Sequence, residues 1–132
     1  MAQVRIIMVS VNADAFALQL ATSLSRILPP GFAATAAGAR IHIGAPDGFG
    51  STVWLDLVDE VERGPERFET AAWQVLSTAQ DVVSETTGMP WPRATGAALD
   101  LALPFARVEG RTLHLWFGDE HAPAVRLAPV AM

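Results

Sequence analysis

The sequence has 132 residues, enough for a single domain over 1–132 whose core needs no disulfide or metal to hold it. Hydrophobic residues make up 51% and charged residues 17%, which is a globular composition, and the lack of cysteine excludes disulfides, iron–sulfur clusters, thiolate zinc sites and thiol catalysis. The formal net charge is −5, and the nine basic residues are scattered arginines without a cluster, so we expect no nucleic-acid binding.

The N-terminal part of the chain predicts a strand followed by a helix. Residues 3–11, QVRIIMVSV, are rich in Val and Ile, which favour strands. Asn12 suits a helix cap, with Asp14 in the first turn, and the Pro-Pro-Gly run at 29–31 ends the helix. The apolar stripe of this predicted helix over 13–28 consists of Phe16, Leu20, Leu24 and Ile27.

The same N-terminal residues bear on location. No apolar run reaches the ~18–20 residues that span a bilayer, so we expect no membrane insertion. The run IIMVSV after Arg5 resembles a short signal peptide, but it falls short of the usual apolar region of about 7–15 residues. We therefore expect a cytoplasmic protein, in keeping with the absence of cysteine.

The abundance of Ala, Gly and Pro and the use of Arg without Lys indicate a GC-rich, bacterial source.

The next segment predicts a pair of antiparallel strands. Residues 32–39 form a connection or a weak edge strand, and 40–45 and 51–58 alternate between apolar and polar side chains. The intervening PDGFG supplies turn residues, with proline at the second position of a turn and glycine where φ is positive. A loop centred near residue 48 pairs His42 with Trp54 and Arg40 with Asp56.

The second half predicts a long helix and a hairpin. Pro65, two acidic residues in the first turn and Gly88 place a helix over about 65–87. Strands over 103–108 and 111–117 flank Glu109-Gly110, read as a two-residue turn, and a last strand over 124–130 contains Pro129, which places it at an edge. This hairpin register pairs Arg107 with Thr112, Phe105 with His114, and Leu103 with Trp116.

These elements predict an α+β domain, an antiparallel or mixed sheet with two helices on one face. The predicted order is β-α-β-β-α-β-β, whose first six elements match the ferredoxin-like order. From the first helix onward, the element order, size and acidity resemble the architecture of type III secretion chaperones, which are small and dimeric.

The predicted strands place an unusual set of side chains on the sheet face that points away from the helices. The predicted interface residues are Trp54, Phe105, Trp116, His42, His114, Arg40 and Arg107, together with Trp91 from a proline-flanked loop. Three interpretations stay open for this face: cover by the chain's own loop, an interface with a second copy or a protein partner, and a small-molecule cleft. Trp91 either plugs the core or anchors a partner, and Trp73 is expected to widen the apolar face of its helix.

Sequence patterns for catalysis are weak. GAPDGFG lacks the Lys-Ser/Thr and the following helix of a phosphate loop, and GDEH at 118–121 is read as a turn rather than a metal site. A His42–His114 pair and the acidic run at 56–62 are minor candidates for proton transfer or cation binding. We expect no cofactor and no metal, and a non-enzymatic protein that binds a partner or forms a homodimer. The alternative is a small-ligand-binding protein or cofactor-free enzyme that uses the His, Arg and Trp side chains of the sheet face.

Overall fold

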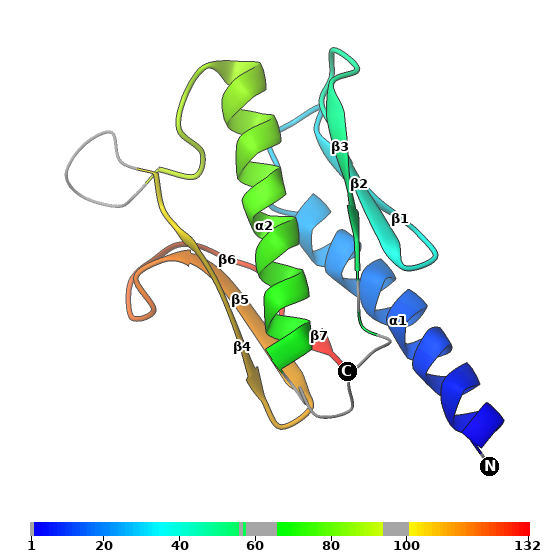
Figure 1. Ribbon diagram of the computed structural model, residues 1–132. Coiled ribbons are helices and arrows are strands. Elements are labelled where there is room, and N and C mark those ends of the chain that lie inside the picture. The colour runs from blue at the N-terminus through cyan, green and yellow to red at the C-terminus, as the bar shows by residue number, and fades with distance from the viewer. Residues whose placement is uncertain (1, 56, 58–65, 94–100) are drawn as a thin grey trace.

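The computed structural model describes residues 2–55, 57, 66–93 and 101–132, with side chains from Ala13 on in the first helix. Its elements are α1 (Ala2–Ser25), β1 (Ala33–Ala37), β2 (Arg40–Gly44), β3 (Gly50–Trp54), α2 (Glu66–Thr87), β4 (Pro104–Glu109), β5 (Thr112–Gly118), β6 (Pro123–Arg126) and β7 (Val130–Ala131). The strands form two antiparallel sheets, β1-β2-β3 and β4-β5-β6 with β7 also on β5, and the helices lie beside them (Figure 1). The α+β class with two helices is confirmed, although the strands divide into two sheets where we expected one.

The first element is a helix, so the predicted strand over 3–11 is wrong and the ferredoxin-like order does not hold. Before Leu28 the sequence has no Gly or Pro to stop a helix, and Val and Ile cost a helix less than about 0.7 kcal/mol each. The helix therefore runs through Asn12 and Asp14, which are interior positions and not its cap and first turn. No helix in the described part of the chain is long and apolar enough to cross a membrane.

The β1-β2-β3 sheet confirms the predicted strand pair and the weak edge strand, but its register differs from the prediction by two residues. Arg40 lies opposite Trp54, and His42 lies opposite Thr52. This register centres the loop on Asp47. The Asp47 carboxylate stabilises the loop, because it accepts a hydrogen bond from the backbone N–H of Phe49 at 2.9 Å. The predicted pairing of Arg40 with Asp56 falls on a residue outside the described part of the chain.

The β4-β5 hairpin is also two residues out of the predicted register. Phe105 pairs with Trp116 and Arg107 pairs with His114, so the turn consists of Gly110 and Arg111. Tight hairpin turns need a positive φ at their first central residue, which glycine adopts easily and glutamate does not. Gly110 has φ 64°, and it occupies this position in place of Glu109.

The predicted last strand is divided into β6 and β7, which both pair with β5. Proline has no N–H to donate to a ladder, and Pro129 lies between the two strands. Leu127, also in the interval, still donates from its backbone N–H to the Leu115 carbonyl at 3.1 Å. The segment therefore forms an interrupted edge strand, as the position of Pro129 predicts.

α2 confirms the predicted helix within one residue, and Gly88 with φ 74° follows its last turn. Its carboxylate at Glu69 accepts a hydrogen bond from the backbone N–H of Val108 at 2.8 Å. Strand residues alternate in the direction of their backbone groups, and this N–H points to the edge of β4 that does not face β5. Glu69 therefore holds α2 against β4, and its carboxylate occupies the Val108 N–H, which would otherwise be a free hydrogen-bond donor at the edge of the sheet.

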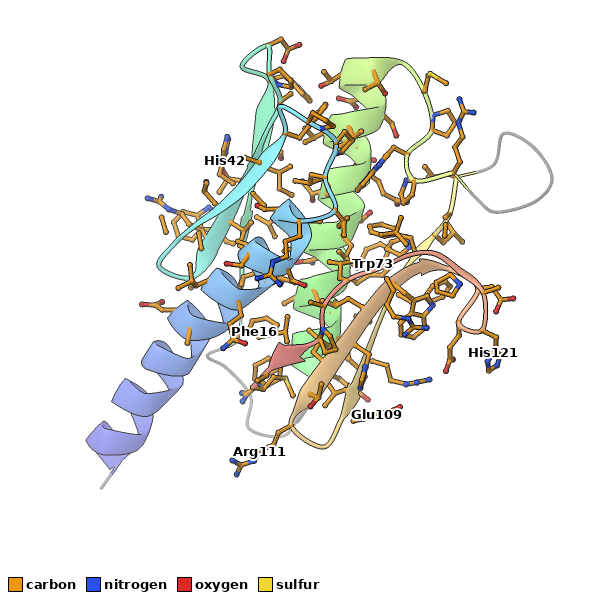
Figure 2. All side chains as sticks on the ribbon, turned by 180° about the vertical axis from the view of Figure 1, so that it is seen from behind. Phe16, His42, Trp73, Glu109, Arg111 and His121 are labelled. Atoms are coloured by element: carbon orange, nitrogen blue, oxygen red, sulfur yellow. The ribbon has the colours of Figure 1, made fainter. Side chains whose placement is uncertain are left out.

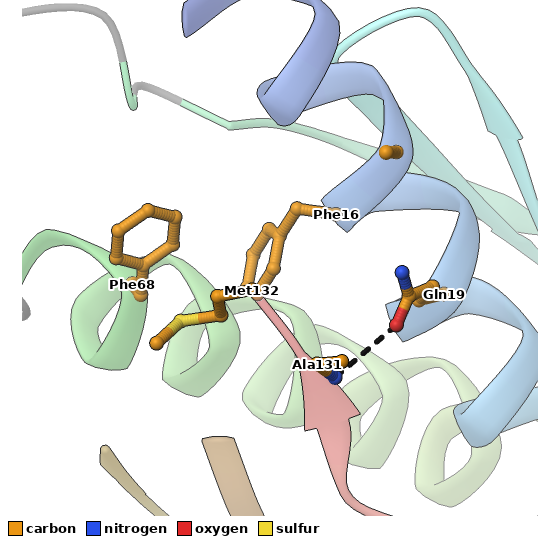
Figure 3. A pocket seen from close by; sticks show the side chains of 6 residues that line it. Phe16, Gln19, Phe68, Ala131 and Met132 are labelled. Atoms are coloured by element: carbon orange, nitrogen blue, oxygen red, sulfur yellow. Dashed lines mark hydrogen bonds between the residues drawn. The ribbon is translucent and has the colours of Figure 1, made fainter. Parts of the chain in front are cut away.

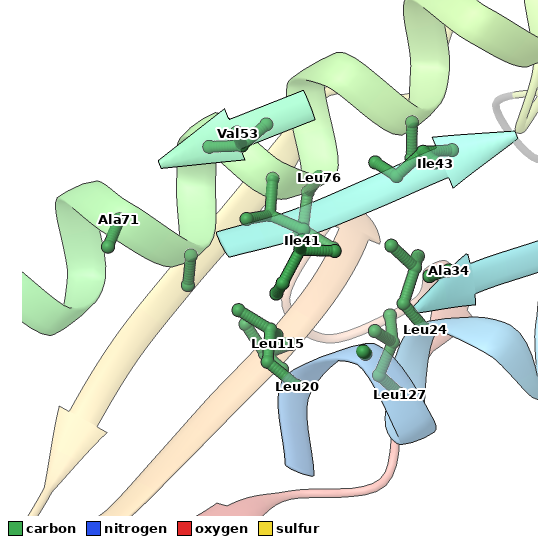
Figure 4. Packing of buried hydrophobic residues seen from close by; sticks show 14 of the residues in the cluster. Leu20, Leu24, Ala34, Ile41, Ile43, Val53, Ala71, Leu76, Leu115 and Leu127 are labelled. Carbon is green, nitrogen blue, oxygen red and sulfur yellow. The ribbon is translucent and has the colours of Figure 1, made fainter. Parts of the chain in front are cut away.

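One apolar core joins both helices to both sheets. α1 packs on β1, β2 and β7, and α2 packs on β2, β3, β4 and β5. Figure 4 shows Leu20, Ile41, Leu76 and Leu115 converging from α1, β2, α2 and β5. All four side chains are fully buried, at 0–1% exposure. The predicted stripe of the first helix is therefore core, although Ile27 is only partly buried, and α2 likewise buries one face against the sheets.

The Glu69–Val108 bond leads to a stability prediction. Glu69→Ala is expected to lower the free energy of unfolding by about 1.5–3 kcal/mol, the usual net contribution of a hydrogen bond to a charged group. Urea denaturation measures the change. Glu66→Ala is the matched control, because Glu66 is an exposed acid in the same helical turn. Equal losses in the two variants would show that the bond to Val108 adds nothing to the favourable charge–dipole interaction that both acids share.

Candidate docking surface

Three predicted interface residues lie on the outer face of the β1-β2-β3 sheet. Arg40, His42 and Trp54 alternate with Ile41 and Val53, which are buried, so they point away from the helices. The Arg40 guanidinium carbon lies 5.1 Å from the Trp54 ring centre, a cation–π contact. Trp54 is nevertheless 67% exposed, which is unusual for so large an apolar side chain.

The outer face of the second sheet presents Phe105 and covers Trp116. The two rings stack with centres 5.7 Å apart, and the Arg107 guanidinium carbon lies 5.5 Å from the Trp116 ring centre. Trp116 is consequently only 5% exposed, whereas Phe105 is 44% exposed. We expected Trp116 to be a contact residue, but the structure makes it the support beneath Phe105.

The charged groups of this second face are paired with one another. Arg107 forms salt bridges with Glu120 at 2.6 Å and with Glu109 at 2.8 Å. The hydrogen bond to Glu120, followed by the negative charges of Glu120 and Glu109, raises the pKa of the Arg107 guanidinium. His114 lies 3.7 Å from Glu109. Because these charged groups already pair with one another, few of them remain free on this face to bind a ligand.

The predicted residues therefore do not share one sheet. Figure 2 shows the separation, with His42 on the first sheet and Glu109 at the end of the second. The helix α2 lies between the edge strands β3 and β4 of the two sheets, and Trp73 projects from its outer side with 48% exposure. We expected Trp73 to widen the apolar face of the helix, whereas it points outward and joins the two groups of aromatic residues.

Two grooves meet at Trp73. The β3–α2 groove has a volume of about 350 Å³ and is lined by Thr52, Val53, Trp54, Trp73, Gln74, Ser77 and Thr78. The α2–β4 groove has a volume of about 320 Å³ and is lined by Glu69, Thr70, Trp73, Pro104, Phe105 and Ala106. Trp54, Trp73 and Phe105 thus form a line across β3, α2 and β4, which we call the aromatic strip.

Trp91 faces inward. Its ring lies 5.5 Å from the ring of Phe117 in an edge-on arrangement, and Phe117 is fully buried. The peptide bond between Trp91 and Pro92 is cis. Of the two interpretations of this tryptophan, the structure supports the core plug.

The minor catalytic and metal candidates are not brought together. His42 donates to or accepts from Thr52 at 3.0 Å, and it lies on a different sheet from His114. In GDEH, the Asp119 carboxylate accepts a hydrogen bond from the backbone N–H of His121 at 2.8 Å, which is the turn that was predicted. No cluster of three or more His, Asp or Glu suited to a metal occurs among the described residues. The acidic residues Asp56, Asp59, Glu60 and Glu62 lie outside the described part of the chain.

An apolar cavity near the C-terminus offers a small-molecule alternative. Figure 3 shows Phe16, Gln19, Phe68, Ala131 and Met132 around it, and the rings of Phe16 and Phe68 lie 5.1 Å apart. The Ala131 N–H donates to Gln19 at 3.2 Å, which uses the amide oxygen within the fold. Its volume of about 240 Å³ is below the ~300–1,000 Å³ typical of ligand sites. The cavity therefore does not favour the ligand-binding alternative.

Comparison with protein-family models, curated proteins and solved structures finds no match for this chain. The candidate surface therefore depends on the geometry alone. The role of Trp73 at this surface was not predicted, because its helical position is next to the apolar stripe and gives no sign that two sheet edges flank it. The exposed strip is the feature on which a function can be argued.

Proposed function

We propose that this chain is a non-enzymatic interaction protein that binds another polypeptide through the aromatic strip. One observation carries the proposal: Trp73 lines both grooves and so connects the exposed rings of Trp54 and Phe105 into one surface. Tryptophan is enriched among the residues that dominate binding energies at protein interfaces. The strip is flanked by Arg40, and arginine is the other residue type enriched at such sites.

The size of the strip supports a protein partner. Exposures of 67%, 48% and 44% leave about 300 Å² of aromatic surface, since each ring buries ~150–250 Å² when covered. The largest apolar patch of a typical monomer is ~300–600 Å² and often has a function. Surrounding polar groups such as Thr70 and Gln74 complete the polar rim that standard interfaces have.

The small-ligand alternative has weaker support. It required a pocket in which His42 and His114 converge, and these residues occupy different sheets. The cavity beside His42 is lined by Thr35, Ala37, Arg40, His42 and Thr52, with no contribution from the second sheet. Action as a homodimer and a location in the cytoplasm belong to the proposal, and the cysteine-free composition supports the location.

Peptide display tests the proposal. We expect random peptides selected on the immobilised whole chain to lose about 30- to 700-fold in affinity for the double variant Trp54→Ala/Trp73→Ala, because interface anchors contribute about 2–4 kcal/mol. Leu18→Ala is the control, since Leu18 is 60% exposed on α1 and does not line either groove. Fluorescence anisotropy with labelled peptides measures the affinities.

Sedimentation of the chain without peptide completes this test. A wild-type dimer that the double variant dissociates would support the proposal, with a second copy as the partner. A chain that selects no peptide and sediments as a monomer at hundreds of micromolar would contradict it. Equal loss of peptide affinity in the Leu18→Ala control would also contradict it, because the effect would not be specific to the strip.

A further inference from the structure

The β3–α2 groove extends beyond the aromatic strip. Trp54 and Trp73 line one part of it, and further along α2 a separate cavity of about 270 Å³ is lined by Asp47, Phe49, Glu85 and Thr86. Residue numbers rise along α2 as they fall along β3, so the strand and the helix run in opposite directions past each other. The groove and this cavity share no lining residue, but they follow one another along α2, so an extended chain that runs past both meets an aromatic end and an acidic end.

The wall formed by β3 is a strand edge. Leu55 donates from its backbone N–H to the Ala39 carbonyl at 2.8 Å, so its backbone groups face β2. Backbone groups alternate along an antiparallel strand, which directs those of Val53 to β2 and those of Thr52 and Trp54 toward the groove. No strand in the described part of the chain pairs with this side of β3. An edge of this kind can accept an additional strand.

The groove and the separate cavity differ in chemistry, and they are the two ends of the path that a bound chain would follow. Trp54 and Trp73 expose apolar rings at one end. Asp47 and Glu85 are exposed at the other end, and neither forms a salt bridge with a residue that the structure describes. A bound chain that complements both ends carries an apolar side chain and a basic side chain.

The edge of β4 is a weaker candidate for the same role. Its Val108 N–H already donates to Glu69, so an added strand would lose that donor. The α2–β4 groove also has an acid, Glu69, that is engaged within the fold. The unoccupied backbone at Thr52 and the acidic end near Glu85 favour the β3–α2 groove.

We propose that the β3–α2 groove binds an extended segment of a partner protein, which adds as a strand to the outer edge of β3. The segment places an apolar side chain between Trp54 and Trp73, and a Lys or Arg beside Asp47 and Glu85. Trp73 and Glu85 are 12 residues apart on α2, about 18 Å at ~1.5 Å per helical residue, so the two anchors are about six residues apart on one face of the segment at ~3.3 Å per strand residue. This inference depends on the proposed function and specifies its partner.

The selected peptides test the sequence requirement. We expect an apolar residue and a Lys or Arg at a spacing of about six, in either chain direction. Trp73→Ala should weaken binding at least tenfold, and Glu85→Lys should weaken it about three- to tenfold, as expected for reversal of an exposed charge pair. Replacing the basic residue of the peptide by Glu should restore binding to Glu85→Lys. Glu66→Lys, an exposed charge reversal elsewhere on α2, is the control and should have no effect.

Hydrogen exchange with the bound peptide tests the strand addition. The amides of Thr52 and Trp54 should become protected, whereas Ser51 and Val53 should change little because they already pair with β2. Peptides that bind through the strip without protecting Thr52 and Trp54, or that lose affinity in Phe105→Ala and not in Glu85→Lys, would overturn this inference and leave the proposed function standing. A failure to select any peptide by a monomeric chain would overturn both.

Discussion

Leu76→Ala is expected to lower the free energy of unfolding by about 2–5 kcal/mol, the range for a leucine removed from a packed core. Leu76 is fully buried on α2, where Ile41 from β2 and Leu115 from β5 meet it (Figure 4). Its removal therefore leaves a cavity at the junction of both sheets. Chemical denaturation monitored by circular dichroism measures the loss.

Leu18→Ala is the matched control for this substitution. It removes the same atoms from a helical leucine that is 60% exposed on α1. Its effect should stay within about 0.5 kcal/mol, as for most surface substitutions. A loss below about 0.5 kcal/mol for Leu76→Ala as well would mean that this face of α2 is not part of the core.

Trp116→Ala is expected to destabilise the fold by about 3–5 kcal/mol, the range for a buried aromatic side chain truncated to alanine. Trp116 is 5% exposed although it lies on the outer face of its strand, because Phe105 stacks on it and Arg107 lies over its ring. Its truncation removes a buried ring and the platform for Phe105. Thermal and urea denaturation measure the effect.

Trp54→Ala provides the comparison for Trp116→Ala. Trp54 is on the outer face of the other sheet and is 67% exposed, so its truncation should cost the fold less than about 1 kcal/mol. Similar losses in the free energy of unfolding of the two variants would contradict the conclusion that Trp116 is a buried structural residue and that Trp54 belongs to the docking surface. The effect on peptide affinity should be the reverse. Among molecules that remain folded, the Trp54→Ala variant should bind the peptide more weakly than the Trp116→Ala variant.

Sequence patterns predicted α2 closely. Proline, early acids and the terminal glycine define α2, because each acts locally on the helix ends. The N-terminal segment was not predictable in the same way. Its Val and Ile residues favour strands by small energies, and the adjoining helix over Phe16 to Leu24 extends through them.

Strand registers required turn geometry that alternation alone does not contain. A shift by two residues keeps every side chain on the same face, so both registers satisfy the apolar pattern equally. The choice depended on Gly110 and on the loop around Asp47. The facing of His42 and Trp54 was therefore predicted correctly while their pairing was not.

The candidate surface was predictable only in part. Alternation identified Trp54 and Phe105 as outward-facing, and both are exposed. It also identified Trp116, whose burial depends on a neighbouring strand bringing Phe105 over it. Trp73 could not be found from the sequence, because its importance comes from the positions of β3 and β4 on either side of α2.

The indole N–H signals of the four tryptophans report directly whether a peptide binds at the aromatic strip. Because the chain has only four tryptophans, a nuclear magnetic resonance spectrum of ¹⁵N-labelled protein can follow all four indole signals in one titration with a selected peptide. Two of these tryptophans, Trp54 and Trp73, belong to the aromatic strip, and the other two, Trp91 and Trp116, pack against other rings of the fold. We expect the signals of Trp54 and Trp73 to shift on saturation, while those of Trp91 and Trp116, packed against Phe117 and Phe105, keep their positions. Signals of Trp54 and Trp73 that do not move when the peptide is bound would contradict binding at the aromatic strip.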